Sequence, residues 1–205
     1  MAPARAIAPL APLAPLWREL ARKALHFATC AVPVAYALGV SRAHLLVLLG
    51  STCGVALLVE GARRVHAPSR EAFRRVFGSL LRPFEHERLT GATWLAVACV
   101  AAVAVLPRPA AVAALWAATA GDAAAAISGV AWRTWRGVPP QGRSIAGSTT
   151  LLVVSAVGVV ALTGVSPVTG LLVGLSAAAA ERASGRLDDN AVIATAAAAS
   201  FILLS

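Results

Sequence analysis

Apolar residues dominate seven stretches of the 205-residue chain, and short polar connections separate these stretches. A helix needs about 17–25 predominantly apolar residues to cross a bilayer, and the stretches come close to that length. We therefore predict an all-α fold, a polytopic integral membrane protein with about seven transmembrane helices. Their approximate ranges are 24–39, 43–60, 92–107, 109–131, 148–163, 165–180 and 190–205.

One polar connection follows a different pattern. At about 69–84, large apolar side chains recur every three or four positions with arginines between them, which is typical of an amphipathic helix lying at a membrane interface. The apolar positions are Phe73, Val76, Phe77, Leu80, Leu81 and Phe84. Residues 1–16 are rich in proline and alanine, so we expect an irregular tail there, ahead of a single transmembrane domain over 17–205.

The composition agrees with a membrane protein. Hydrophobic residues make up 59% of the chain and charged residues 13%, and the mean hydropathy is +0.76. Soluble domains contain about 25% charged residues, so this chain lacks the polar side chains needed to cover a water-exposed surface.

The basic residues predict an orientation. Sixteen of the 18 lysines and arginines lie in the N-terminal segment and in the connections 61–91, 131–147 and 181–189, whereas the alternate connections hold only Arg42 and Arg108. Basic connections stay in the cytoplasm, so we expect a cytoplasmic N-terminus in the cell membrane. Because this asymmetry accounts for the net charge of +9, the charge calls for no nucleic-acid partner.

The acidic residues point to chemistry at one membrane face. Eight of the nine carboxylates lie on or beside the expected cytoplasmic face, and only Asp122 lies within an apolar stretch. A transporter is expected to place polar groups along a path across the membrane. The pattern favours an enzyme at the cytoplasmic interface, with a transporter or membrane-bound binding protein as the non-enzymatic alternative.

Asp122 is the most informative single residue. An acid within a transmembrane helix costs about 2.5–3.5 kcal/mol on insertion scales, so it requires a partner or a cation. Gly121, Ala125 and Gly129 surround it with small side chains, which leaves room for a ligand or for a close helix. We interpret Asp122 as a functional residue; the alternative is a polar residue that packs helices together.

The stretch 137–144, GVPPQGRS, has the outline of a phosphate-binding P-loop. A P-loop follows a buried strand, which is absent from this pattern, and Pro139 and Pro140 remove two backbone donors. The end of the stretch nevertheless suits an anion, because a helix N-terminus and an arginine both bind phosphate. The residues concerned are Arg143, Ser144, Gly147 and Ser148. The alternative is a cytoplasmic loop whose basic residues only follow the positive-inside rule.

Two further polar sets lie at the same face. Residues spaced along one side of a helix entering the membrane are Glu19, Arg22, Lys23 and His26. Snorkelling cations are the alternative interpretation of the two basic members of this set. The acids Glu85, Glu181 and Asp189, with Asn190, lie near helix starts, and carboxylates close to a phosphate site could hold Mg²⁺. Asp189 alone would suit a helix N-cap.

Taken in order over roughly 19–190, these motifs resemble the CTP-dependent lipid kinases: dolichol kinase, phytol kinase and the fungal-type diacylglycerol kinase. The motifs are E-x-x-R-K-x-x-H from Glu19 to His26; R-x-x-E and T-G at Arg82, Glu85, Thr90 and Gly91; G-D-x-x-A-x-x-x-G at Gly121, Asp122, Ala125 and Gly129; K-S-x-x-G-S as Arg143, Ser144, Gly147 and Ser148; and E…DN at Glu181, Asp189 and Asn190. Arg143 replaces the usual lysine, and Val130 stands where a Gly-Arg or Gly-Lys pair is usual.

The resemblance implies transfer of the γ-phosphoryl group of CTP to the hydroxyl of a membrane lipid such as a polyprenol, phytol or diacylglycerol. It implies catalytic roles for Asp122, Glu85 and Asp189, and Mg²⁺ held by Asp122, Glu181 and Asp189. Arg143 and the helix start that follows it would bind phosphate. Gly121, Gly129 and Arg133 would contribute to the nucleotide site.

The related phosphatidate cytidylyltransferases are the enzymatic alternative. They share the G-D and K-[ST] portions of the pattern, but they end in an H-G-G…D-R-x-D stretch that GRLDDNAVI does not provide. That difference favours the kinase. The partners implied are CTP, a lipid alcohol and the bilayer, and assembly as a homo-oligomer is left open.

Overall fold

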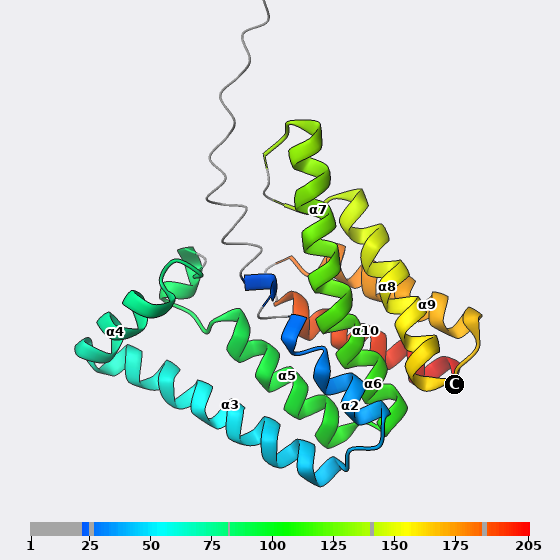
Figure 1. The fold of residues 1–205 in the computed structure, drawn as a ribbon, viewed down its shortest axis with the longest axis horizontal. Helices are drawn as coiled ribbons and strands as arrows, with labels where there is room; N and C mark the ends of the chain where they lie inside the picture. Colours follow the sequence, from blue (N-terminus) through cyan, green and yellow to red (C-terminus); the bar gives the residue numbers. More distant parts are fainter. Residues whose placement is uncertain (1–21, 25–26, 82, 140–141, 186–187) are drawn as a thin grey trace, which may run out of the picture.

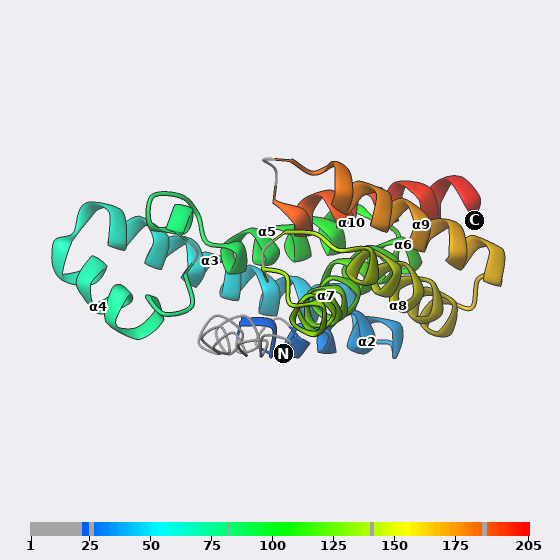
Figure 2. The ribbon, with the colours of Figure 1, turned by 90° about the horizontal axis from the view of Figure 1, so that it is seen from above.

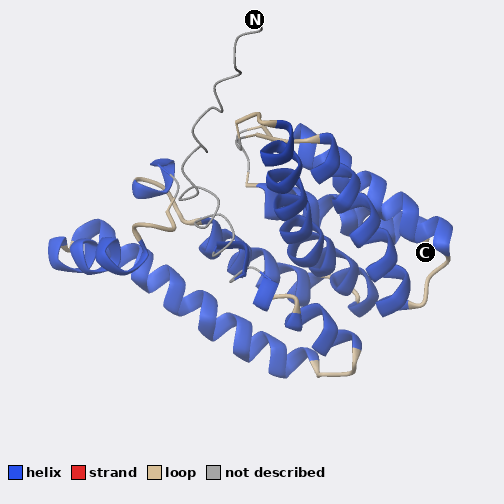
Figure 3. Ribbon diagram, turned by 45° about the horizontal axis from the view of Figure 1, so that its top comes forward, coloured by secondary structure: helices blue, strands red, loops and turns tan. Residues whose placement is uncertain are grey.

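The computed structural model describes residues 22–24, 27–81, 83–139, 142–185 and 188–205. Helices joined by turns and loops make up these ranges, which contain no strand (Figure 3). In chain order the elements are α2 Ala31–Ala37, α3 Arg42–Val65, α4 Ala67–Phe77, the 3₁₀ turn η1 Pro83–His86, α5 Gly91–Val105, α6 Arg108–Trp116, the π-helical turn η2 Ala117–Gly121, α7 Asp122–Arg136, α8 Ile145–Thr163, α9 Pro167–Ala183 and α10 Asp189–Leu204.

The all-α fold expected from the sequence is confirmed for these residues. Three helical segments are long and apolar enough to cross a membrane: α3, α8 and the continuous segment Arg108–Arg136. Helices α5 and α10 are apolar but shorter. The membrane character is therefore supported by length and composition, whereas seven spans and a cytoplasmic N-terminus stay predictions. The expected tail over 1–16 lies outside the described residues.

Two element boundaries differ from the sequence-based expectation. Helix α7 continues to Arg136, five residues beyond the predicted end at 131, and stops at Gly137, whose φ of 66° is left-handed. The amphipathic helix was expected at about 69–84, but α4 ends at Phe77. Gly78 is the C-cap of α4, and the helix ends before it because glycine is a poor helix former.

Helix α6 lies at the centre of the bundle. Its residues 110–115 are buried on every side. A helix at this position therefore needs a continuous run of apolar residues and not an amphipathic stripe. One core cluster packs α6 against α8, α9 and α10, and a second packs it against α2, α3 and α5. Figures 1 and 2 show α4 at the far end of α3, away from the α8–α9 hairpin.

Helices α7 and α8 approach closely because small residues face each other. A Cβ atom on Gly129 would lie 2.9 Å from Ser144 Oγ, and one on Gly147 would lie 2.9 Å from the carbonyl oxygen of Ala125. A Cβ on Gly121 would meet Ser155 Oγ at 2.6 Å. Glycine at these positions lets two backbones come together, as small residues do in membrane helix pairs.

A π-helical turn interrupts the long central segment directly before Asp122. Turn η2 covers Ala117–Gly121, and all five of its residues are buried. Such turns occur mostly as single insertions in α-helices, frequently at functional sites. Helix α6 before the turn is buried all round, whereas α7 after it buries one face only.

Several helix ends meet at one end of the bundle, which we call the polar end. Helices α7 and α9 finish there, and α5, α8 and α10 begin there, whereas α3 finishes further out, next to α4 (Figure 1). The alternation follows from antiparallel neighbours joined by short connections. It brings residues from across the sequence together, and most of the predicted functional residues lie there.

The packing of α8 against the central segment yields a first prediction. A Cβ on Gly158 would overlap the indole of Trp116, whose Nε1 donates to the Val154 carbonyl at 2.9 Å. We expect Gly158→Ala to destabilise the protein by about 1–3 kcal/mol, the usual cost of overpacking. Thermal unfolding in detergent micelles measures it. Gly54→Ala is the matched control, because nothing lies within 4 Å of a Cβ at that position; equal behaviour of the two variants would contradict the packing.

Candidate functional site

Asp122 is held by a buried ion pair with Lys23. The ammonium group of Lys23 donates to Asp122 Oδ2, and the two side chains are 7% and 12% exposed. Asp122 begins α7, and Lys23 comes from the segment that precedes α2, 99 residues earlier in the chain. The partner that a buried acid requires is therefore supplied, at least in part, by the protein itself.

A pocket of about 500 Å³, which we call the chamber, opens beside this ion pair. Its apolar wall comes from α2, α3, α4 and α5, with Val32, Leu49, Phe73 and Cys99 among the contributing side chains. Its polar end carries Arg22, Lys23, Glu85, Asp122, Asp188, Asp189 and Asn190. The chamber thus combines an apolar interior with a cluster of charges at one end.

Asn190 marks the polar end of the chamber. The residue is 8% exposed, and its Oδ1 atom has no hydrogen-bond partner among the residues that the structure describes. A buried polar atom without a partner costs free energy, so such atoms are rare in native proteins. A polar group of a ligand in the chamber would provide the missing partner.

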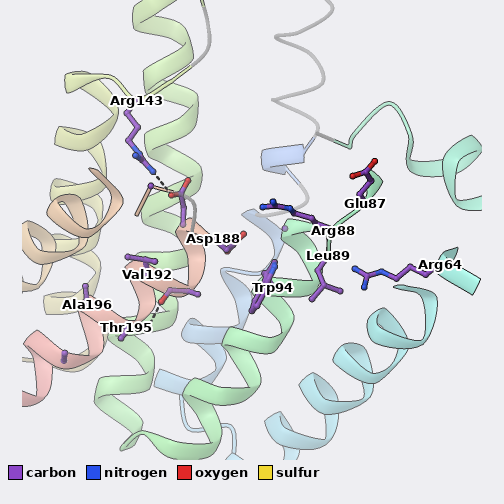
Figure 4. Close-up of a pocket in the computed structure, with 15 residues that line it drawn as sticks. Arg64, Glu87, Arg88, Leu89, Trp94, Arg143, Asp188, Val192, Thr195 and Ala196 are labelled. Atoms are coloured by element: carbon purple, nitrogen blue, oxygen red, sulfur yellow. Dashed lines mark hydrogen bonds and ion pairs between the residues drawn. The ribbon is translucent and has the colours of Figure 1, made fainter. Parts of the chain in front are cut away.

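A second and larger pocket of about 1510 Å³, which we call the groove, lies between α5 and α10. Figure 4 shows Arg143 and Asp188 on the α10 side, and Arg64 and Arg88 on the opposite side. The groove and the chamber share Gly91, Asp188 and Asp189 in their linings. The two pockets therefore meet at the start of α10.

Asp188 is the N-cap of α10, a role the sequence suggested for Asp189. Its Oδ1 accepts the backbone N–H of Asn190 at 3.1 Å. Burial raises the pKa of the Asp188 carboxyl, although hydrogen bonds from the backbone and side chain of Asn190 act in the opposite direction. The charge of Asp189 raises this pKa further. Asp189 itself is the first residue of the helix and is left to interact with Arg143.

Arg143 links the loop before α8 to the start of α10. Its guanidinium lies 2.9 Å from Asp189 Oδ1, donates to Ser184 Oγ and donates to the Arg182 carbonyl at 3.3 Å. Ser184 also donates to Asp189 Oδ1. The predicted phosphate-binding arginine is thus already oriented toward the shared edge of the two pockets.

Glu181 and Ser148 form a neighbouring contact, in which Ser148 Oγ donates to Glu181 Oε2 at 3.0 Å. Glu181 follows the apolar stretch 165–180, near the end of α9. Burial raises the pKa of its carboxyl, and the charges of Asp122 and Asp189 raise it further, whereas Ser148 and Arg143 act in the opposite direction. Three carboxylates therefore influence one another at the polar end.

The remaining residues of the predicted nucleotide loop have structural contacts. Ser144 is the N-cap of α8, and its Oγ accepts the Gly147 N–H at 3.0 Å. Arg133 donates to the carbonyl of Pro139 at 3.2 Å and to that of Arg143, so it supports the loop from the end of α7. Gly121 and Gly129 lie at the α7–α8 contact, and neither they nor Arg133 line the two pockets.

Glu85 lies on η1, immediately before α5. Its carboxylate accepts the backbone N–H of Gly91 at 2.8 Å, and the residue is 4% exposed. An acid that accepts a free N–H at a helix start is stabilised there by the helix dipole. Glu85 thereby connects the 83–90 loop to the beginning of α5, and both residues line the chamber.

A buried ion pair between Glu60 and Arg63 holds this loop, and no sequence motif indicated it. The pair has an N–O distance of 2.6 Å, and the two residues are 3% and 5% exposed. Arg63 also donates to the carbonyls of Glu85 at 3.0 Å, Arg88 at 2.6 Å and His86 at 3.4 Å. The pair therefore fastens the loop that carries Glu85 to the end of α3.

The structure brings together about half of the predicted site residues. Those that line the chamber or the groove are Arg22, Lys23, Glu85, Asp122, Arg143, Asp189 and Asn190. Those that line neither are Gly121, Gly129, Arg133, Ser144, Gly147, Ser148 and Glu181. The predictions for Glu19 and His26 fall outside the described residues.

Sequence reasoning did not select Asp188 as a functional candidate or notice Glu60 and Arg63. A signal existed for Asp188, since it directly precedes Asp189 at the start of an apolar stretch. For the other two, the only signal was an acid and a base three residues apart near the end of a span, which is common at membrane surfaces.

The acidic residues fit a metal ion shared with a nucleotide better than a metal site made of protein alone. In the described part of the chain, no three His, Cys, Asp or Glu side chains are gathered to hold a metal ion. Mg²⁺ often uses only one or two carboxylates together with waters and substrate phosphates. Asp122 and Asp189 line the same chamber and would suit that arrangement.

Comparisons with known proteins identify no relative, since no family model, no curated protein and no solved structure matches the chain. The function is therefore inferred from the geometry of the polar end and from the motifs in the sequence.

The Lys23–Asp122 pair predicts strong coupling between the two residues. Removing one partner of a buried ion pair costs about 3–5 kcal/mol, because the other charge is left uncompensated. We expect Lys23→Met to destabilise the protein by that amount, and Lys23→Met combined with Asp122→Asn to recover most of the loss. Unfolding in detergent micelles measures all three variants. Additive effects of the single changes would contradict a direct pair.

Arg63 predicts a specific change in the mobility of the 83–90 loop. Lysine cannot reproduce the contacts of a planar guanidinium with a carboxylate and three carbonyls. Because hydrogen bonds to charged groups contribute about 1.5–3 kcal/mol, we expect Arg63→Lys to speed amide exchange over 85–91 by about tenfold or more. Hydrogen–deuterium exchange measures this. Arg64→Lys is the matched control on an exposed neighbour, and similar exchange in both variants would remove the role we assign to Arg63.

Proposed function

We propose that the protein is a CTP-dependent lipid kinase, which transfers the γ-phosphoryl group of CTP to the hydroxyl of a membrane lipid at the cytoplasmic face. The observation that carries the proposal is the chamber, where an apolar interior reaches directly to the buried Asp122 and its charged neighbours. The order of motifs that resembles this kinase family supports it independently.

The chamber suits a lipid alcohol as acceptor. An acyl or isoprenoid chain would contact side chains such as Leu49, Leu95 and Phe73, and the hydroxyl would lie at the end that holds Asp122 and Asn190. The Oδ1 atom of Asn190 would accept the hydroxyl hydrogen bond. A ligand that is mostly apolar with a single polar end fits this division of the lining, since burying further polar groups in the apolar part would cost free energy.

The nucleotide phosphates would lie at the edge shared by the chamber and the groove. Arg143 is directed there, and a guanidinium binds phosphate oxygens in a bidentate fashion. The N-terminus of α8, capped by Ser144, adds the favourable end of a helix dipole. Asp189 keeps Arg143 oriented in the meantime, so the arginine needs little rearrangement to contact phosphate.

Asp122 and Asp189 would hold Mg²⁺ together with the phosphates, and the ion would supply charge neutralisation during transfer. Lys23 balances the charge of Asp122 and lies within the same pocket. Glu181 lines neither pocket, and its contact with Ser148 supports the start of α8. Glu85 positions the 83–90 loop through Gly91, beside the proposed reacting groups.

The reaction forms one bond and breaks one bond. The lipid oxygen attacks the γ-phosphorus, and the bond from that phosphorus to the oxygen bridging the β and γ positions breaks, so CDP leaves with the electron pair. The hydroxyl proton passes to a carboxylate that lines the chamber. Catalysis then consists mainly of positioning and electrostatic stabilisation, as in phosphoryl transfer generally.

Following the phosphorus tests the proposal. We expect γ-labelled CTP to label a lipid alcohol in vesicles that contain the protein, and α-labelled CTP to leave the lipid unlabelled. Polyprenol, phytol and diacylglycerol are supplied separately, because an unsuitable acceptor would give a false negative. Label from the α position only would indicate a cytidylyltransferase, and no transfer to any acceptor would favour a binding protein or transporter.

Two variants make this test specific. Asp122→Asn is expected to remove nearly all transfer, whereas Glu71→Gln, on α4 and outside both pockets, is expected to leave it unchanged. Both changes remove one negative charge, so a difference between them reports the position of the carboxylate. A folded Asp122→Asn variant with full transfer would overturn the assignment.

A further inference from the structure

The groove has features that the proposed kinase reaction does not use. At the polar end its lining includes Arg64 and Arg88, and further along it is formed by Trp94 of α5 and by residues of α10. The α10 residues below the polar end are Val192, Thr195, Ala196 and Ala199. Figure 4 shows Val192, Thr195 and Ala196 following one another along α10, facing the helix that carries Trp94.

Positive charge is available on the α3–α5 side of the groove, opposite Arg143. Arg143 and Asp189 neutralise each other in an ion pair of 2.9 Å on the α10 side. The side chains of Arg64 and Arg88 have no ion-pair or hydrogen-bond partner among the residues that the structure describes, and both are exposed, as is the nearby Glu87. These two guanidinium groups can therefore bind an anion without breaking an existing contact.

The shape of the groove indicates an amphiphile. From Asp189 to Ala199 the α10 wall extends about 15 Å at 1.5 Å per residue, about half the thickness of a bilayer hydrocarbon core. Trp94 is 41% exposed and lies in the first turn of α5, the depth at which indoles favour the membrane interface. A free anion would leave the apolar wall uncovered, and a neutral lipid would leave the two guanidinium groups without a counter-charge.

We propose that the groove binds an anionic phospholipid, with its phosphate at Arg64 and Arg88 and an acyl chain along α10 between Trp94 and Ala199. Basic pockets between membrane helices on the cytoplasmic side are typical sites for anionic headgroups. The phosphate and acyl-chain contacts of this site lie in the groove outside the acceptor chamber, and the proposal does not depend on the proposed kinase activity. Because the two pockets share Gly91, Asp188 and Asp189, an occupied groove would stabilise the start of α10 that also borders the chamber.

Thermal unfolding of the full chain in vesicles tests the headgroup contact. Equimolar phosphatidylglycerol and phosphatidylcholine should raise the Tm by about 5 °C over phosphatidylcholine alone, as expected for a ligand that binds the folded state. Arg64→Gln combined with Arg88→Gln should lose most of that increase. The matched control is Arg74→Gln with Arg75→Gln on α4, which removes the same charge outside the groove and should retain it.

Equal losses in both double variants would overturn the proposal, since they would indicate a general effect of surface charge. An equal Tm in phosphatidylcholine alone would overturn it as well, because the lipid would then be ordinary bilayer lipid. Soluble glycerol 3-phosphate should give no increase. An increase equal to that of phosphatidylglycerol would show that a free phosphate suffices, which contradicts a lipid site.

A second pair of variants tests the acyl chain. Ala199→Trp fills the apolar end of the groove without changing charge, and it should reduce the phosphatidylglycerol retained after purification, measured by native mass spectrometry. Val157→Trp places the same side chain on the exposed face of α8, away from the groove, and should leave retention unchanged. Unchanged retention in Ala199→Trp would overturn the assignment of the α10 wall to the lipid chain.

Discussion

The structure depends on the need to compensate a carboxylate buried in an apolar bundle. Asp122 begins α7 beside residues that are almost entirely small and apolar, and an ion in such surroundings is stable only with a partner. Lys23 provides that partner from 99 residues earlier in the chain. The chamber that this pair lines is also lined by Glu85 of the 83–90 loop and by Asp189 and Asn190 at the start of α10.

Close helix contacts make this arrangement possible. Gly129 and Gly147 let α7 and α8 approach until a Cβ would collide, and so bring the N-terminus of α8 beside Ala125 and Gly129 of α7. The Glu60–Arg63 pair does the equivalent for the other half of the molecule by tying the loop before α5 to α3. Two halves with separate cores thus meet at one polar boundary, where both the proposed acceptor chamber and the lipid groove open.

The sequence predicted the fold class and the approximate ranges of the helices, because apolar stretches and membrane-length limits are strong, local signals. It also identified Asp122, since an acid in an apolar stretch is costly to bury and therefore rare. It could not specify which cation pairs with Asp122, because that choice depends on a contact 99 residues apart in the chain. For Gly121 and Gly129 the sequence left room for either a ligand or a close helix, and the structure places both where two helices touch. Residue spacing alone does not distinguish these two uses of a small side chain.

The π-helical turn before Asp122 lets the side chains of α6 and of α7 point in different directions, although the two helices form one continuous segment. Each residue of an α-helix advances the side chains by about 100°, so one extra residue in η2 turns everything after it relative to everything before. Helix α6 can therefore keep the orientation that suits the core, while α7 presents Asp122 to Lys23 and Gly129 to the start of α8. Deleting one residue from Ala117–Gly121 would preserve composition and hydrophobicity, yet point the acid toward a different neighbour. The site therefore depends on the rotation of this helix about its axis at position 122 as much as on the presence of an acid there.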